Sequence, residues 1–257
     1  MQKSYTDHAI DIVCIFGLTE EVFSQTLVGG NYFVTLQTMG NDDWYRHKTW
    51  DNEVEADFEA RLKRSRGAYN KAQYLRIQAS YLLDSADKEN QLVGLNLIER
   101  LIKDFPTEEF SVIFGQEQLG DYYLDKKAYN EAEHFFRVVT NYYQDKKSRG
   151  GTSALADLKL AETILRSNQT DKFKEAYRIV IDYPISELTF NDSKFYYAEL
   201  RTQLCDAMNK KSEAKEFAKT AIELSKITEP QFSRHKTVGL VKVSERQLRT
   251  LEQILAD

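Results

Sequence analysis

Residues 119–139 combine small and aromatic side chains in a pattern that limits the fold of this chain more than any other. Gly120 is followed by an aromatic residue at Tyr123, and Ala132 is followed one helical turn later by Phe136. Small residues let two helices approach closely, while aromatic rings fill the space around the contact. The pattern therefore predicts two antiparallel helices that cross at Gly120 and Ala132.

Weaker versions of this arrangement recur along the chain. The small residues expected to mark the second helix of each pair are Gly94, Ala132, Ala176 and Ala214, at intervals of 38, 44 and 38 residues. A recurrence on this scale is typical of helical hairpins stacked into an array, in which each unit buries its apolar face against its neighbours. We therefore expect about four such hairpins.

The stretch from Leu119 to Val139 resembles one tetratricopeptide (TPR) repeat, a helix–turn–helix unit of about 34 residues. The longer and uneven intervals mark the other units as divergent. The resemblance implies an all-α fold, a TPR-like helical-hairpin solenoid of about four repeats with capping helices at both ends. We accordingly expect an N-terminal capping segment at 1–50, helical repeats at 51–228, and a loop with a C-terminal capping helix at 229–257.

Local signals predict several helix ends. Pro106 and Pro184 each follow the end of a second helix, because proline disfavours helical geometry in the residue before it. A Gly-Gly break at 150–151 precedes a helix expected from Ala154. Residues 51–66 read as a helix with an acidic start and a basic end, the orientation that suits the helix dipole.

Composition limits the classes of function. Three prolines and eleven glycines in 257 residues favour long uninterrupted helices, and a net charge of −5 argues against a general nucleic-acid binder. No apolar run reaches the length of a transmembrane helix, and the N-terminus lacks the basic start of a signal peptide. We expect a cytoplasmic protein with no membrane partner and no nucleic acid.

The sequence contains no phosphate-binding loop, dinucleotide-binding glycine pattern or nucleophile turn. Cys14 and Cys205 lie far apart among apolar or helical neighbours and are expected to be buried free thiols. The four histidines show no metal-ligand spacing, and His134 is expected to pack or to lie on the surface. We therefore expect no catalytic site, no metal and no cofactor.

Two charged stretches have simple explanations as well as functional ones. The acidic and basic runs within 51–66 predict ion pairs one turn apart, Asp57 with Arg61 and Glu59 with Lys63. His235 has basic neighbours, Arg234 and Lys236, which makes it a candidate for an anion or partner contact.

In TPR proteins the first helix of each repeat lines the inner groove. The resemblance places groove positions in this chain, to which we add one member of a tyrosine pair: Arg76, Ser80, Glu117, Asp121, Tyr122, Glu162, Arg166, Glu199 and Gln203. Only two of them, Arg76 and Arg166, are basic, unlike in family members that grip a C-terminal carboxylate. An acidic groove of this kind would favour a basic or polar partner.

Together these features predict a non-catalytic adaptor or regulatory subunit that binds another protein or peptide. Two alternatives stay open at this point. One is an immunity-type protein that neutralises a toxin. The other is a ligand-sensing or enzymatic role centred on the N-terminal segment, using Cys14 or His47. The sequence does not specify the partner or the oligomeric state.

Overall fold

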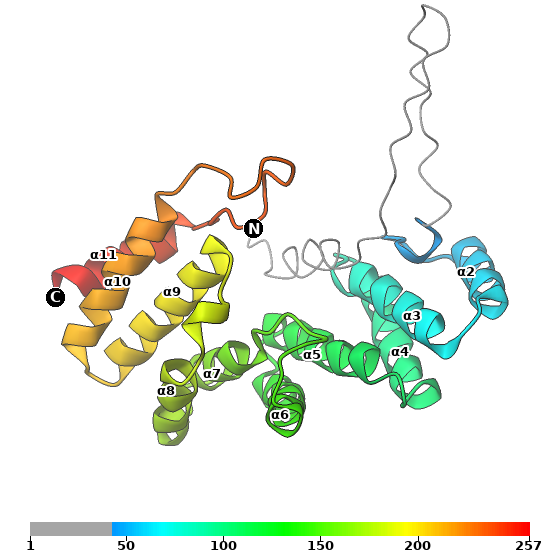
Figure 1. The fold of residues 1–257 in the computed structure, drawn as a ribbon, viewed down its shortest axis with the longest axis horizontal. Helices are drawn as coiled ribbons and strands as arrows, with labels where there is room; N and C mark the ends of the chain where they lie inside the picture. The colour runs from blue at the N-terminus through cyan, green and yellow to red at the C-terminus, as the bar shows by residue number, and fades with distance from the viewer. Residues whose placement is uncertain (1–42) are drawn as a thin grey trace, which may run out of the picture. The chain divides into compact units, whose positions relative to one another are not determined.

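The structure, a computed structural model, describes residues 43–257, and every regular element in that range is helical (Figure 1). The all-α prediction is confirmed for this range. The α-helices are α2 (Asn52–Arg64), α3 (Ala68–Leu83), α4 (Lys88–Asp104), α5 (Glu109–Asp125), α6 (Tyr129–Lys146), α7 (Ala156–Arg166), α8 (Phe173–Ile181), α9 (Asn191–Ala207), α10 (Lys211–Ser225) and α11 (Glu245–Ala256). Short 3-10 helices are η1 (Asp43–Tyr45), η2 (Thr170–Lys172) and η3 (Ile185–Glu187).

The chain forms two compact units, which are described separately. The first ends at Gly115 and the second begins at Gln116, so the boundary lies inside α5. The segments expected at 1–50, 51–228 and 229–257 remain a prediction. None of the helices in the described range is sufficiently long and apolar to cross a membrane.

In the first unit, α3 and α4 pack side by side around a core that includes Leu75, Leu82, Ile98 and Leu101 (Figure 1). A Cβ atom placed on Gly94 of α4 would lie 3.0 Å from the Leu83 side chain of α3. This close approach is the one expected from a small residue at a helix crossing.

Helix α2 begins where predicted, because the Asp51 side chain accepts hydrogen bonds from the backbone N–H groups of the first turn. Its Asp57–Arg61 ion pair is confirmed, with a separation of 2.9 Å. The expected Glu59–Lys63 pair is wrong, because Glu59 instead binds Arg100 of α4. The acidic face of α2 is therefore used to attach this helix to its neighbour.

Aromatic rings form a small second core beside α2. Trp44 and Trp50 both pack against the fully buried Phe58, with ring centroids 5.4 and 5.3 Å away. Tyr74 of α3 lies 4.8 Å from Trp44. The two tryptophans therefore pack residues 43–50 onto α2 and α3. Residues 1–42, with Cys14 and His8, lie outside the described residues.

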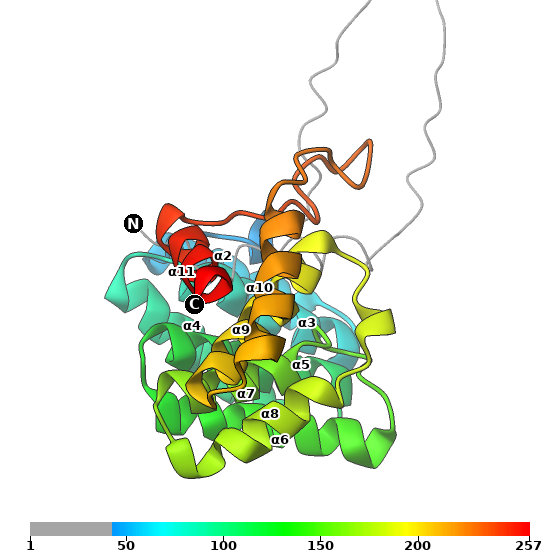
Figure 2. The same cartoon turned by 90° about the vertical axis from the view of Figure 1, so that its left-hand side faces the viewer.

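In the second unit, consecutive helices pack against each other from α6 to α11 (Figure 2). Its largest fully buried side chains include Phe136, Leu158, Ile164, Leu204 and Leu251. The last of these belongs to α11, which packs on α10 against alanines that present a flat, small-residue face. A capping box formed by Ser244 and Gln247 starts α11.

The predicted start of α7 is wrong by two residues. The helix begins at Ala156, whereas Ala154 has a φ of +65°. A residue in this left-handed region cannot continue a right-handed helix. Pro106 and Pro184 do follow helix ends as predicted, since α4 ends at Asp104 and α8 at Ile181.

The crossing of α5 and α6 is as close as the sequence indicates. A Cβ atom on Gly120 would lie only 2.6 Å from the ring of Phe136, which is itself fully buried. No real Cβ atom tolerates that distance, so the ring and the glycine must be paired for α5 and α6 to pack as they do.

We predict that Gly120→Ala destabilises the protein by about 1–3 kcal/mol through overpacking. The sign is diagnostic, because alanine in a helix normally stabilises by up to about 1 kcal/mol relative to glycine. Urea unfolding would measure the change. Gly150→Ala is a control for replacing a glycine in a turn, since its Cβ would meet only Ser148 Oγ at 3.3 Å. A stabilised Gly120→Ala variant would contradict the crossing.

Candidate partner-binding surface

In the first unit, the two residues predicted to line a groove, Arg76 and Ser80, both interact with neighbouring groups of the same unit. Arg76 is only 7% exposed, and its guanidinium lies over the ring of Phe114, 4.4 Å from the centroid. The hydroxyl of Ser80 donates to the backbone carbonyl of Ile77 at 2.7 Å. Arg76 therefore contributes to packing through a cation–π contact.

The second unit places Glu117 and Asp121 together on α5, facing Lys159 of α7. Glu117 is fully buried and accepts hydrogen bonds from Lys159 Nζ and from the backbone N–H of Ser153, both at 2.9 Å. The hydroxyl of Ser153 donates to it as well. Asp121 accepts from the same Lys159 ammonium at 2.8 Å. One lysine thus serves two carboxylates.

This unequal balance of charge changes the acidity of the cluster. Burial raises the pKa of Asp121 to about 7; the nearby Glu117 carboxylate adds to this effect and Lys159 only partly opposes it. Burial alone would lower the pKa of Lys159, but its two carboxylate neighbours raise it instead. The lysine therefore stays charged near neutral pH, while Asp121 titrates there.

At the next two junctions a carboxylate again accepts from a side chain further along the chain, although the donor differs. Glu162 of α7 accepts from the hydroxyl of Tyr196 on α9 at 2.6 Å. Glu199 of α9, only 6% exposed, accepts from the side-chain amide of Gln247 on α11 at 3.1 Å. We call the four acidic residues of α5, α7 and α9 that make these contacts the carboxylate ladder: Glu117, Asp121, Glu162 and Glu199.

A parallel set of contacts joins the intervening helices. Glu133 of α6 accepts from Lys172 at 2.7 Å, and Arg137 of α6 binds Glu175 of α8 at 2.8 Å. Although burial opposes ionisation, hydrogen bonds from Lys172, Gln169 and Arg137 lower the pKa of Glu133 to about 2. From α8, the hydroxyl of Tyr177 donates to Glu213 of α10 at 2.7 Å.

The remaining predicted groove residues are more accessible. Tyr122 is half-buried, with its ring 5.3 Å from the ring of Tyr123 and from Lys126 Nζ. Arg166 binds Glu162 at 3.0 Å and leaves 34% of its side chain exposed. Gln203 is half-buried and donates weakly to Glu199 at 3.4 Å.

The sequence interpretation missed the donors that satisfy the ladder. Lys159 follows Asp121 by 38 residues and Tyr196 follows Glu162 by 34, so these two donors occur about one repeat after their acceptors, whereas Gln247 follows Glu199 by 48. A search for donors displaced by one repeat from each acidic groove position would have found both.

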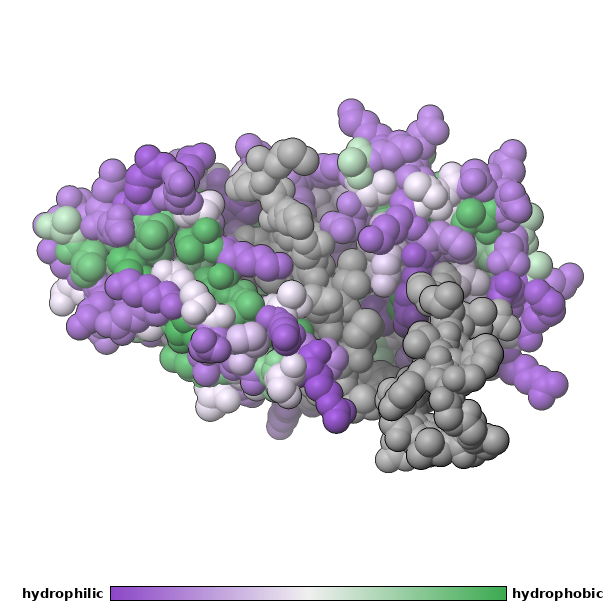
Figure 3. Space-filling view, turned by 90° about the horizontal axis from the view of Figure 1, so that it is seen from above, coloured by the Kyte–Doolittle hydropathy of each residue, from purple (hydrophilic) through white to green (hydrophobic). Residues whose placement is uncertain are grey.

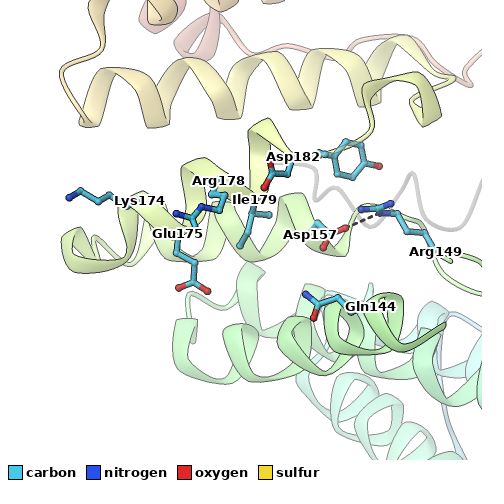
Figure 4. A pocket seen from close by; sticks show the side chains of 9 residues that line it. Gln144, Arg149, Asp157, Lys174, Glu175, Arg178, Ile179 and Asp182 are labelled. Carbon is cyan, nitrogen blue, oxygen red and sulfur yellow. Dashed lines mark hydrogen bonds and ion pairs between the residues drawn. The ribbon is translucent and has the colours of Figure 1, made fainter. Parts of the chain in front are cut away.

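A cavity of about 440 Å³ lies beside α6, α7 and α8 (Figure 4). Its lining comprises Gln144, Arg149, Asp157, Lys174, Glu175, Arg178, Ile179, Asp182 and Tyr183. The three cationic side chains are balanced by three carboxylates. Arg149 is bound to Asp157 at 2.8 Å, as the dashed line in Figure 4 shows. The lining therefore has no excess charge with which to select an ionic ligand.

The surroundings of Cys205 make its thiol a poor nucleophile. Cys205 is a buried free thiol, as predicted, and burial together with Glu213 raises its pKa to about 11. No group of three or more metal-ligating side chains gathers within residues 43–257. His134 is exposed and packs edge-on against Phe135, in agreement with its expected role.

Comparison with protein-family models, curated proteins and solved structures finds no significant match to this chain.

We predict that Asp121→Asn changes how stability depends on pH. Because the pKa of Asp121 is about 7 in the folded state, against 3.8 as its ordinary value, the native state binds more protons than the unfolded state between these values. The contribution of Asp121 to stability therefore falls as pH rises from 5 to 8 in the native protein. The variant should lose this component, so that its stability relative to the native protein rises by about 1–3 kcal/mol over that interval.

Urea unfolding at several pH values would measure the difference. Asp104→Asn is the matched control, because this side chain is 46% exposed and pairs with Arg100 at the surface. A constant difference between Asp121→Asn and the native protein from pH 5 to 8 would contradict the assigned shift.

Proposed function

We propose that this chain is a TPR-like helical-repeat protein that binds another protein or peptide without catalysing a reaction. The observation that carries the proposal is a similar contact at three successive junctions, from α5 to α7, α9 and α11, where a carboxylate accepts from a lysine, a tyrosine and a glutamine in turn. In an array of like units, each unit contacts its neighbours in the same way. Such scaffolds present extended surfaces to partners.

The predicted groove positions have two different roles in this proposal: some join the helices, and others would contact the partner. Glu117 and Glu199 are buried and bound within the unit, so they hold the helices in place. Tyr122, Arg166 and Gln203 are the accessible members and would contact the partner. Tyrosine suits this task because it offers a large contact area at a low cost in conformational entropy.

Either an adaptor or a regulatory subunit would bind its partner in this way. A cytoplasmic location remains a prediction from the sequence.

Affinity capture from the native cell lysate, at low and moderate salt, tests this proposal. We expect one protein to be retained in stoichiometric amount and to bind the purified chain directly. Tyr122→Ala should weaken that binding by about tenfold, as removal of an aromatic anchor does. Tyr69→Ala is the control, because Tyr69 of α3 is 54% exposed and lies outside the predicted groove.

If no protein is retained at either salt concentration, the adaptor proposal fails. If a partner binds the Tyr122→Ala variant as tightly as the native chain, the proposed contact surface is wrong and the partner uses another face. Thermal unfolding of both variants would establish that each is folded.

A further inference from the structure

The segment between α10 and α11 differs in charge from the rest of the molecule. Residues 226–243, here called the basic loop, protrude from the second unit without regular structure (Figures 1 and 2). They carry Lys226, Arg234, Lys236 and Lys242 against a single acidic residue, Glu229. This excess of three positive charges belongs to a chain whose net charge is −5.

These cations are available, unlike those that join the helices of the second unit. All four are exposed, and within the described residues none of them forms an ion pair or a side-chain hydrogen bond. By contrast, Lys159, Lys172 and Arg137 are each bound to carboxylates of the same unit. The acidic groups predicted to meet a basic partner are thus bound internally, and the unpaired charge of the loop is positive.

Exposed apolar side chains accompany this charge. Phe232 and Ile227 are 37% and 39% exposed, and both lie in the same loop as the four cations. Phe232 packs edge-on against Phe190, with centroids 5.9 Å apart, and 37% of the residue remains exposed to solvent. Seen from above, this end of the second unit carries hydrophobic residues with hydrophilic ones beside them (Figure 3).

The base of the loop is held in place. The side chain of Gln231 accepts from the backbone N–H of Asn191 at 2.7 Å and donates to the carbonyl of Thr189 at 3.1 Å. Gly239 has a φ of +75°, and a Cβ there would lie 2.0 Å from the Gln231 amide oxygen. Because the loop is already ordered at this point, it loses less conformational entropy when a partner binds.

We propose that the basic loop binds an acidic protein segment that carries a large apolar residue. Its carboxylates would pair with Arg234 and Lys236, and its apolar side chain would pack on the exposed part of Phe232. The inference rests on the proposed function, because it specifies the chemistry of the partner. The partner segment would be acidic, whereas the acidic groove positions predict a basic or polar partner.

A protein segment fits these observations better than a polyanion or a bilayer. An extended phosphate backbone or an anionic membrane would also meet the surrounding surface of a chain with net charge −5. A short segment bound at the loop would interact mainly with the charges of the loop, because screening limits charge interactions to about 8–10 Å at physiological salt. Two exposed apolar side chains also offer little area for insertion into a bilayer.

Fluorescence anisotropy with defined peptides tests the inference directly. The probe is a labelled peptide in which glutamates flank a Leu-Phe pair, and its counterpart has lysine in place of each glutamate. We expect the full chain to bind the acidic probe, to bind it less tightly as salt increases, and to bind the lysine peptide at least about tenfold more weakly.

Variants locate the interaction. Reversing two loop charges, with Arg234→Glu and Lys236→Glu, should weaken acidic-probe binding by about tenfold or more. Phe232→Ser should weaken it by about threefold to tenfold. The control combines Lys174→Glu with Lys219→Glu, which changes the net charge equally at two other exposed positions of the second unit. It should retain binding within about threefold.

Several results would overturn the inference. Equal loss in the loop and control variants would indicate a general effect of net charge. Equal binding of both peptides would show that charge does not select the partner. Loop-dependent flotation with phosphatidylserine vesicles, or loop-dependent binding of single-stranded RNA, in the absence of acidic-probe binding would assign the loop to those ligands instead.

The same variants separate this inference from the proposed function. If the partner captured from lysate binds the loop variant as tightly as the native chain, the loop inference fails and the adaptor proposal stands. If the native chain captures no partner, the adaptor proposal itself fails.

Discussion

The hydrogen-bonded ion pair between Glu117 and Lys159 is the contact on which the second unit most depends. A fully buried carboxylate needs charged or polar partners, because leaving it unpaired costs about 3–5 kcal/mol. Glu117 obtains them from Lys159 and from the loop residue Ser153. The requirement therefore fixes α7 and the segment before it against α5, and through them the contacts that lead to α9 and α11.

This use of charge separates the interior of the unit from its surface. Carboxylates on α5, α7 and α9 accept hydrogen bonds from side chains on α7, α9 and α11, respectively. These contacts help to define how the helices pack. Charges bound in this way are not available to a partner. The basic loop has the opposite character, since its cations are exposed and unpaired within the described residues. Burial and pairing thus distinguish the charged residues that hold the helices together from those that are exposed.

The sequence predicted the helices well because their signals are local. The Gly120–Phe136 contact, the start of α2 at Asp51 and the helix ends before Pro106 and Pro184 all follow from short-range patterns. Ala154 escaped prediction because a left-handed residue other than glycine has no reliable sequence signal.

The candidate surface was harder to predict because burial and pairing depend on residues distant in the chain. The sequence placed Glu117 on the inner side of a first helix, but its donors come from Ser153 and Lys159, 36 and 42 residues later. Local spacing also favoured Lys63 as the partner of Glu59, whereas the folded chain provides Arg100. The partner of a charged group is set by tertiary packing.

A double-mutant cycle at Glu117 and Lys159 tests the central claim most directly. Free energies of unfolding would be measured for Glu117→Gln, for Lys159→Met and for the two combined. We predict a coupling energy of about 1.5 kcal/mol or more, as for groups in direct charged contact. Additivity of the two substitutions within about 0.5 kcal/mol would contradict the account, because it would show that the two residues act independently.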